Sequence, residues 1–259
     1  MSNPQPLYTR DNCRFSCPLQ WGLTVFWRQA EPDDGWFQEL AAATEPDGIR
    51  PLKHHFREPA ISQFAISTQP HVSPLRVVQR VKGRLQYLVR HRRPKAFQGN
   101  YAIRSVGHVT RQGIEAYVAD QLGHHRMADP RIQARFAQYQ IERPDVDLSQ
   151  PQKTSHGIYW YNLHVVLVHR ERWMEVREEV LQRVHDMIIR ACEGKGYRLS
   201  RAGILADHVH LVLGCPIEVA PDEVVLGFLN NLAFVQGMRP IYQFGGFVGT
   251  VGEYTTNAW

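Results

Sequence analysis

The sequence of 259 residues predicts an α+β fold in which one β-α-β-β-α-β unit occurs twice. Three observations carry this prediction. Each half opens with an alternating, strand-like run; a helical stretch and a pair of short apolar runs follow; a proline-led helix and a glycine-containing strand close the half. This order of elements is the ferredoxin-like, or split βαβ, pattern with antiparallel sheets.

The first unit is expected over residues 19–126, after an N-terminal extension over residues 1–18. Its opening strand reads Leu-Gln-Trp-Gly-Leu-Thr-Val-Phe-Trp from Leu19, with apolar and polar residues in near alternation. The helix and the two short apolar runs that follow are expected at Gly35–Ala43, Leu52–Phe56 and Gln63–Ser67.

The second unit is expected over residues 155–259, after a polar linker over residues 127–154 that contains Pro130, Pro144 and Pro151. Its opening strand is expected over Ile158–Val168. A helix is expected over Arg172–Gly194, because apolar residues recur there at helical spacing and Gly194 and Gly196 end the pattern. The two short apolar runs are Tyr197–Leu205 and His208–Gly214.

The closing parts of the two units match most closely. A helix opens at the end of Ser67–Pro74 in the first unit and at the end of Gly214–Pro221 in the second, with proline at the helix start in both. After these helices, Ser105-Val-Gly-x-x-Thr110 matches Thr250-Val-Gly-x-x-Thr255. The first unit adds one more helix over Thr110–Gln121, with Thr110 as its N-cap.

Composition places the chain among ordinary globular proteins. Hydrophobic residues make up 43% and charged residues 21%, and the formal net charge is +5. No apolar run reaches the ~18 residues of a membrane span, and the first residues contain no signal-like apolar stretch. We therefore expect no membrane partner, a cytoplasmic location and four reduced cysteines.

Basic residues cluster in one stretch of the first unit. From Pro74 to Lys95 eight cations occur without an acid among them, which is the pattern expected of contacts to nucleic-acid phosphates. A solvated helix face is the alternative. The cations are Arg76, Arg80, Lys82, Arg84, Arg90, Arg92, Arg93 and Lys95. Arg104 is a further candidate for a phosphate contact, with an ordinary surface arginine as its alternative.

The sharpest chemical signal is Asp207-His-Val-His-Leu-Val-Leu213. Residues two apart in a strand face the same side, so His208 and His210 present two imidazoles together while Val209 turns away. Two neutral imidazoles form half of a divalent-metal site. Alternatively, they are two polar residues on an exposed strand face.

A second signal lies on the extra helix of the first unit. Tyr117 and Gln121 are four residues apart and therefore share one helix face. A phenol can attack phosphorus and hold a covalent intermediate, and an amide oxygen can complete a metal shell. Ordinary amphipathic packing is the alternative for this pair.

The chain as a whole resembles the single-tyrosine HUH transposases of insertion sequences, whose relatives include the REP-associated tyrosine transposases. The resemblance lies in the order of elements and in four segments: Asp207-His-Val-His-Leu-Val-Leu-Gly-Cys-Pro216, Ser73–Gly83, Tyr101–Thr110 and the Tyr-x-x-x-Gln helix. The resemblance implies that His208, His210 and Gln121 bind Mg²⁺ or Mn²⁺. It also implies that Tyr117 attacks single-stranded, hairpin-bearing DNA to give a 5′-phosphotyrosine during DNA transposition. A nucleoid-associated enzyme that works as a dimer is the corresponding expectation.

The sequence departs from this family pattern in both units. The first unit has Ile61 and Gln63 where the second has its histidines, so its metal half-site is lost. The second unit has no counterpart of Tyr117, because the matching position would be 262, beyond Trp259. Tyr254 aligns with Val109 and is expected to be structural. The sequence therefore predicts a fused pseudo-dimer with one composite active site.

Three other functions remain open at this point. The chain is alternatively a catalytically inactive or domesticated transposase-derived protein that binds single-stranded nucleic acid. It is alternatively a housekeeping enzyme that processes chromosomal hairpins. An unrelated zinc hydrolase using His208, His210 and Asp207 is the third alternative, although no third ligand at suitable spacing is evident.

Overall fold

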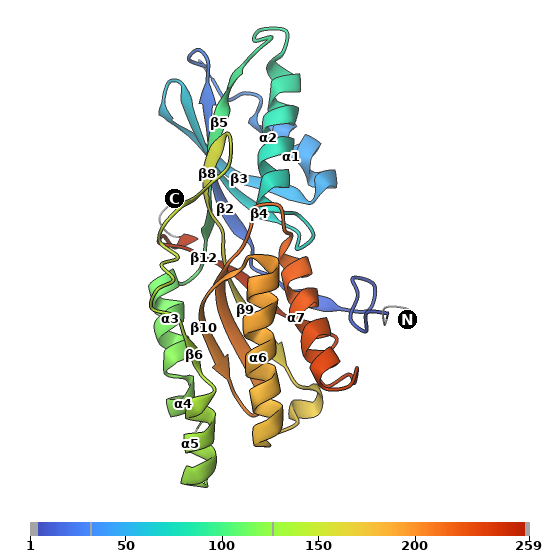
Figure 1. Ribbon diagram of the computed structural model, residues 1–259. Helices are drawn as coiled ribbons and strands as arrows, with labels where there is room; N and C mark the ends of the chain where they lie inside the picture. The colour runs from blue at the N-terminus through green and yellow to red at the C-terminus, as the bar shows by residue number, and fades with distance from the viewer. Residues whose placement is uncertain (1–4, 32, 126, 257–259) are drawn as a thin grey trace.

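The computed structural model describes residues 5–31, 33–125 and 127–256 and contains two six-stranded sheets with helices packed against them (Figure 1). The predicted α+β class is therefore confirmed. Among the described helices none has the length and apolar character needed to cross a membrane.

The first sheet has the strand order β3-β4-β2-β5-β8-β7. Strand β2 places Trp21, Leu23 and Val25 in the core, because alternate residues of a strand face one side. Helices α1 (Phe37–Thr44) and α2 (Pro74–Val89) cover that face. The strands are β2 (Gln20–Trp27), β3 (Ile49–Glu58), β4 (Ile61–Thr68), β5 (Phe97–Val106), β7 (Gln152–Lys153) and β8 (Gly157–Trp160).

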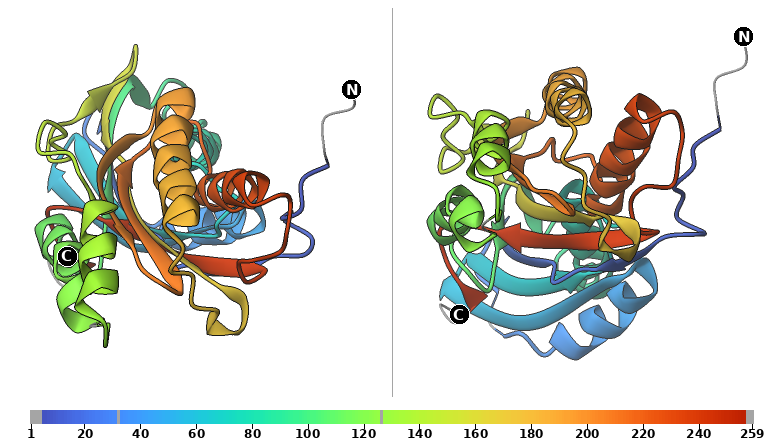
Figure 2. Two further views of the ribbon diagram at one scale, coloured as in Figure 1. Left: turned by 60° about the horizontal axis from the view of Figure 1, so that its bottom comes forward. Right: turned by 90° about the horizontal axis from the view of Figure 1, so that it is seen from below.

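The second sheet has the strand order β1-β12-β9-β11-β10-β6. Helices α6 (Glu178–Lys195) and α7 (Pro221–Val235) pack on one face, and α3 (Arg111–Ala119) packs on the opposite face across β10 and β11 (Figure 2). The strands are β1 (Arg14–Ser16), β6 (Ile141–Glu142), β9 (Asn162–Val168), β10 (Arg198–Ile204), β11 (His208–Gly214) and β12 (Gly245–Val251).

Four strands follow the same order in the two sheets. The run β3-β4-β2-β5 in the first corresponds to β10-β11-β9-β12 in the second, and all neighbours within these runs are antiparallel. The helices also occupy matching places in the chain: α1 and α6 follow the first strands, and α2 and α7 precede the last.

The two halves exchange matching hydrogen bonds where helices α2 and α7 begin. Leu75 N donates to Ile217 O at 3.1 Å, and Asp222 N donates to Pro70 O at 3.0 Å. Leu75 and Asp222 are each the second residue of their helix. The two acceptors also match, because Pro70 lies five residues before Leu75 and Ile217 lies five residues before Asp222. Each half thus satisfies one amide that a helix start leaves without an intrahelical partner.

Three expectations about chain segments need correction. The helix predicted over Arg172–Gly194 begins only at Glu178, because Glu171 and Arg172 adopt positive φ in the 3-10 turn before it. The predicted strand Ile158–Val168 is interrupted at Tyr161, where the chain passes from β8 in the first sheet to β9 in the second. Tyr161, the residue at which the chain changes sheets, is buried and packs edge-to-face against Trp21, with ring centroids 5.3 Å apart. Residues 127–154, expected as a linker, form α5 (Pro130–Gln138), β6 and β7.

Candidate functional site

The two histidines of the predicted pair lie in the middle of the second sheet. Strand β11 runs between β9 and β10, and His208 and His210 project to the face that α3 covers. Both are buried, at 5% and 4% exposure, and their ring centroids are 4.9 Å apart. The strand therefore brings the two imidazoles together, as the alternation predicts.

Each imidazole is held through its Nδ1 atom. His210 Nδ1 lies 2.9 Å from Nε2 of His164 on β9, and the two rings are nearly coplanar, at 8°. His208 Nδ1 lies 2.6 Å from Asp207 Oδ1. The carboxylate accepts from His208 Nδ1–H, which leaves the Nε2 lone pair of that ring available. Arg172 in turn pairs with Asp207 at 2.9 Å.

Burial keeps these imidazoles neutral. Desolvation lowers the pKa of His210 to about 3 and that of His164 to about 4. Burial also lowers the pKa of His208, although the hydrogen bond to Asp207 acts in the opposite direction. Neutral imidazole is the form that binds metal ions.

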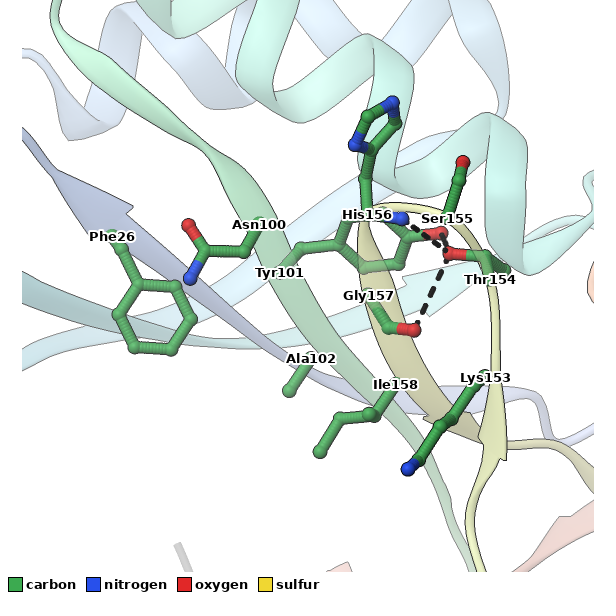
Figure 3. Close-up of a pocket in the computed structure, with 10 residues that line it drawn as sticks. All are labelled: Phe26, Asn100, Tyr101, Ala102, Lys153, Thr154, Ser155, His156, Gly157 and Ile158. Atoms are coloured by element: carbon green, nitrogen blue, oxygen red, sulfur yellow. Dashed lines mark hydrogen bonds between the residues drawn. The ribbon is translucent and has the colours of Figure 1, made fainter.

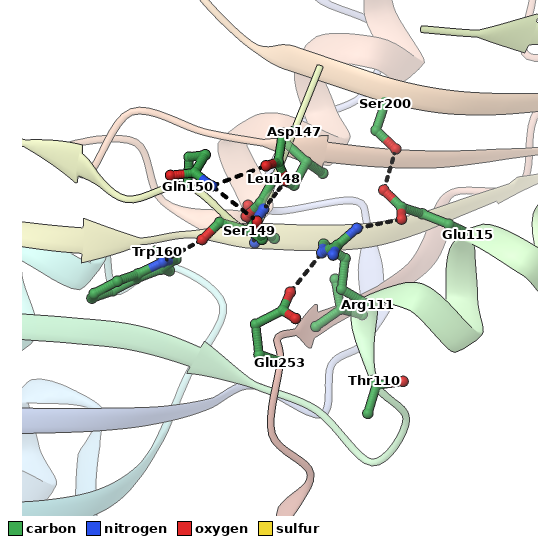
Figure 4. A network of polar contacts seen from close by, with 12 residues as sticks. Thr110, Arg111, Glu115, Asp147, Leu148, Ser149, Gln150, Trp160, Ser200 and Glu253 are labelled. Carbon is green, nitrogen blue, oxygen red and sulfur yellow. Dashed lines mark hydrogen bonds and ion pairs between the residues drawn. The ribbon is translucent and has the colours of Figure 1, made fainter. Parts of the chain in front are cut away.

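Helix α3 is anchored to the second sheet by a polar network at its start (Figure 4). Thr110 is the predicted N-cap, and its Oγ1 accepts from Gly113 N at 3.2 Å. Arg111 pairs with Glu253 at 2.6 Å and with Glu115 at 2.5 Å. Glu115 also accepts a hydrogen bond from Ser200 on β10. These contacts set the position of the rest of the helix over the imidazoles.

The structure brings Tyr117 onto the histidines. Its ring centroid lies 5.7 Å from that of His210 and 6.5 Å from that of His164, with edge-to-face geometry. The Tyr117 side chain is 46% exposed, so the phenol borders solvent while its ring faces the buried imidazoles. A residue of the helix that follows the first sheet thus shares a site with residues of the second sheet.

Gln121 is enclosed beside this site. The helix breaks at Asp120 and resumes as α4 (Gln121–His124), and the Gln121 side chain is only 1% exposed. Its Nε2 donates to Tyr117 O at 3.3 Å, whereas its buried Oε1 has no hydrogen-bond partner among the described residues. One turn further on, the ring of His125 lies 5.1 Å from that of His208. Tyr117 and His125 thus face the histidines, and the buried side chain of Gln121 lies between them in the chain.

These features fit a divalent cation. A buried amide oxygen without a partner is costly unless something binds it, and two neutral imidazoles keep Nε2 atoms that no described side chain engages. No group of three or more His, Cys, Asp or Glu side chains in the described part of the chain is arranged to hold a metal. The candidate ligands are two imidazoles and one amide oxygen, and the described residues offer no third His, Cys, Asp or Glu ligand for the zinc-hydrolase alternative.

The basic block of Pro74–Lys95 is largely engaged within the protein. Acids from other segments pair with it: Asp47 contacts Arg80 and Arg84, each at 3.3 Å, and buried Glu31 contacts Arg92 at 3.4 Å and Arg93 at 3.3 Å. The sequence alone did not reveal these acids, because they are distant in the chain.

The remaining predicted cations differ from one another. Lys82 donates to the carbonyl of Gln98 at 2.8 Å, and Arg90 stacks 3.6 Å from the ring centroid of Tyr87. Arg76 is exposed on α2. Arg104 lies on β5, away from the block, between two aromatic rings. The predicted contacts of these cations with DNA stay predictions.

Three residues near the site were missed by sequence reasoning: His164, His125 and Arg172. A signal existed for His164, which is a lone imidazole inside the apolar strand Asn-Leu-His-Val-Val-Leu-Val. His125 lies four residues after Gln121, so extending the helical face by one turn would have found it. No sequence pattern pointed to Arg172, which reaches Asp207 from a short 3-10 turn over Arg170–Arg172.

One part of this chain matches a known protein family. Residues 158–233 match the family described as "Transposase IS200 like". This region includes His164, His208 and His210, but it ends before β12 and excludes Tyr117. The resemblance to these transposases is confirmed there, and the match supports a function in DNA transposition and recombination. No curated protein matches the chain significantly.

Solved structures give weaker likenesses. A protein of Deinococcus radiodurans R1, described as a candidate transposase, is 19% identical, with 39% of this chain and 88% of that one covered and a TM-score of 0.36. A REP-associated tyrosine transposase bound to a REP hairpin is 13% identical, with 35% and 56% covered and a TM-score of 0.31. These TM-scores are too low to define the fold or function of this chain.

Proposed function

We propose that this protein is a metal-dependent tyrosine transposase that cleaves and rejoins single-stranded DNA, with Tyr117 as its nucleophile. Residues 158–233, which match the IS200-like transposase family, supply the premise. The observation that carries the proposal is the 5.7 Å separation between the rings of Tyr117 and His210, which belong to different halves of the chain.

The covalent step follows from the chemistry of the phenol. The Tyr117 oxygen attacks the scissile phosphorus, a bond forms between them, and the bond from phosphorus to the 3′ oxygen breaks. The phenol gives up its proton to solvent, and the leaving oxygen takes up a proton from solvent to become a free 3′-OH. The 5′-phosphotyrosine keeps the phosphate as an ester, so another 3′-OH can attack the phosphorus. The bond from phosphorus to the Tyr117 oxygen then breaks, the phenol regains a proton, and the new strand is joined without ATP.

His208, His210 and Gln121 are the residues that would hold Mg²⁺ or Mn²⁺. A divalent ion bound there would supply Lewis acidity to the phosphate oxygens. Asp207 orients His208 by accepting its Nδ1–H, and His164 holds His210 through the corresponding atom. Arg172, beside Asp207, offers a cation at the edge of the site for a DNA phosphate.

A fused pseudo-dimer accounts for how one chain assembles this site. The shared strand order of the two sheets supports it, as do the reciprocal hydrogen bonds of Leu75 and Asp222. In this arrangement the second unit donates the imidazoles, and the helix after the first unit donates Tyr117 and Gln121.

The test is the formation of a covalent adduct. Wild-type protein is incubated with Mn²⁺ and labelled, hairpin-bearing single-stranded DNA, and adducts are resolved by denaturing electrophoresis. Tyr117→Phe should abolish the adduct, because phenylalanine lacks the nucleophilic oxygen. Tyr254→Phe is the matched control, since Tyr254 is also exposed, and should leave the adduct intact. A wild-type adduct that survives Tyr117→Phe, or no wild-type adduct with bound DNA, would contradict the proposal.

A further inference from the structure

The face of the first sheet that α1 and α2 leave uncovered carries a row of aromatic and aliphatic side chains. Strands β5 and β8 pair in parallel, with Ala102 opposite Ile158 and Arg104 opposite Trp160, so these side chains share one face. Ile158 is 37% exposed, and Tyr254 extends the row at 52% exposure. We call this surface the aromatic shelf; it comprises Phe26, Arg104, Lys153, Ile158, Trp160 and Tyr254.

Arg104 is the centre of the shelf. Its guanidinium carbon lies 4.7 Å from the ring centroid of Trp160 and 5.3 Å from that of Tyr254. No ion pair or hydrogen bond joins this guanidinium to another described side chain or carbonyl, unlike most cations of α2. Its N–H groups therefore remain available to a phosphate or to the edge of a base.

A hollow of about 470 Å³ continues the shelf along β5 and β8 (Figure 3). Phe26, Ala102 and Ile158 form its apolar floor, and Lys153 borders it. No acidic residue is among those that line it. Where the shelf reaches Arg104, the neighbouring acid is Glu253, whose charge is already paired with Arg111.

We propose that the aromatic shelf binds unpaired bases of single-stranded DNA next to the cleavage site. Exposed rings provide stacking surfaces for bases, and unpaired cations beside them suit the phosphates between those bases. The excess of positive charge favours a nucleic acid over an apolar protein segment as the occupant. The shelf assignment rests on the proposed function, because it takes DNA as the substrate.

The position of the shelf suits a strand that continues to Tyr117. Tyr254 follows Glu253, which pairs with Arg111 at the first position of α3. From Arg111 to Tyr117 the helix advances about 9 Å, at about 1.5 Å per residue. A few nucleotides held on the shelf would therefore lie within reach of the phenol.

The experiment measures binding without cleavage. All variants carry Tyr117→Phe, and fluorescence anisotropy follows a labelled oligothymidylate of about 12 nucleotides. Trp160→Ala and Tyr254→Ala should each weaken binding about tenfold, because each removes a stacking surface. Phe234→Ala is the matched control: Phe234 is 59% exposed, but it lies on α7, which packs on the second sheet away from the shelf, and its loss should leave binding unchanged.

Other variants and readouts keep the outcome decisive. Trp160 Nε1 donates to Ser149 O at 2.8 Å, so Trp160→Ala can loosen the fold. Arg104→Gln and Tyr254→Ala avoid that contact and should still weaken binding. Unchanged affinity in both would overturn the shelf. Unchanged affinity together with a shift in sedimentation would identify the face as a protein interface, which also overturns it. The adduct assay on protein with Tyr117 intact tests the proposed function separately.

Discussion

Ser105 and Thr250 make reciprocal hydrogen bonds where the ends of β5 and β12 meet. Ser105 Oγ donates to Val251 O at 2.6 Å, and Thr250 Oγ1 donates to Val106 O at 2.6 Å. The two hydroxyls occupy matching positions in Ser105-Val-Gly and Thr250-Val-Gly, the pair of motifs that the sequence comparison aligns. Each half therefore satisfies a carbonyl at the end of the other half's last strand.

The glycines of these motifs allow the two backbones to approach. A Cβ at Gly252 would lie 2.2 Å from Ser105 O, and one at Gly107 would lie 2.5 Å from Thr250 O. Gly252→Ala and Gly107→Ala should each lower the free energy of unfolding by about 1–3 kcal/mol. Urea denaturation measures this. Gly83→Ala, in open space on α2, is the control and should instead raise stability by about 0.5–1 kcal/mol.

Most of the fold was predictable because its signals are local. The alternation of β2, the proline starts of α2 and α7, and the apolar run of β11 each identify an element without knowledge of its partners. The passage of the chain from the first sheet to the second at Tyr161 was not predictable, because an apolar run contains no information about which sheet each residue joins. That choice is made by tertiary pairing with β5 on one side and β12 on the other.

The site was predictable to the extent that sequence spacing fixes a shared face. The strand period predicts that His208 and His210 share one face, and the helix period predicts the same for Tyr117 and Gln121. The hydrogen bond between His164 and His210 depends on the register between β9 and β11, which spacing within one strand cannot provide. The acids that pair with the cations of the basic block were missed for the same reason: ion pairs between distant segments leave no local pattern.

A composite site within one chain predicts the result of mixing two inactive variants. Tyr117→Phe and His208→Ala are each expected to form no adduct, and an equimolar mixture should also form none. The reason is that Tyr117 already lies against the imidazoles of its own chain. The adduct assay checks this, with the wild type at half concentration as the control. Recovery of adduct in the mixture would mean that two chains exchange their tyrosine helices.

Gln121→Leu should change stability and metal affinity in opposite directions. The substitution removes a buried amide oxygen that has no partner, so the metal-free protein should gain about 1 kcal/mol. It also removes a proposed ligand, so the rise in melting temperature with Mn²⁺ should shrink. Differential scanning fluorimetry with and without Mn²⁺ measures both. Gln79→Leu, on the exposed surface of α2, controls for the change of residue type. An undiminished Mn²⁺ shift in Gln121→Leu would exclude Gln121 as a ligand.

His164 is expected to control the tautomer of His210. If His210 Nδ1–H donates to His164 Nε2, the Nε2 atom of His210 keeps a lone pair for a metal. His164→Phe removes the acceptor and should weaken Mn²⁺ binding about 10–100-fold. His164→Gln supplies a carbonyl acceptor and should restore part of the affinity. Isothermal titration calorimetry compares the two, and equal affinities in both variants would show that the hydrogen bond has no role.

Buried His54 should make the fold less stable in acid. Burial among Trp36, Phe56 and Phe64 lowers its pKa below the ordinary value of about 6.5, although Asp34 acts in the opposite direction. Below pH ~6.5 the unfolded chain therefore binds a proton at His54 that the folded chain does not bind. The contribution of His54 to the free energy of unfolding is full above that pH and falls as the pH drops toward the pKa of the folded state. This histidine contributes at most about 1.4 kcal/mol per pH unit.

Urea denaturation of wild type and His54→Phe between pH 7 and pH 5 would isolate this contribution. Phenylalanine keeps the aromatic packing and removes the titrating group, so the variant should lose less stability than the wild type over this interval. His91→Phe serves as the control, because it makes the same replacement at an exposed position. Parallel pH profiles for wild type and His54→Phe would show that the buried imidazole does not set the acid sensitivity of the first unit.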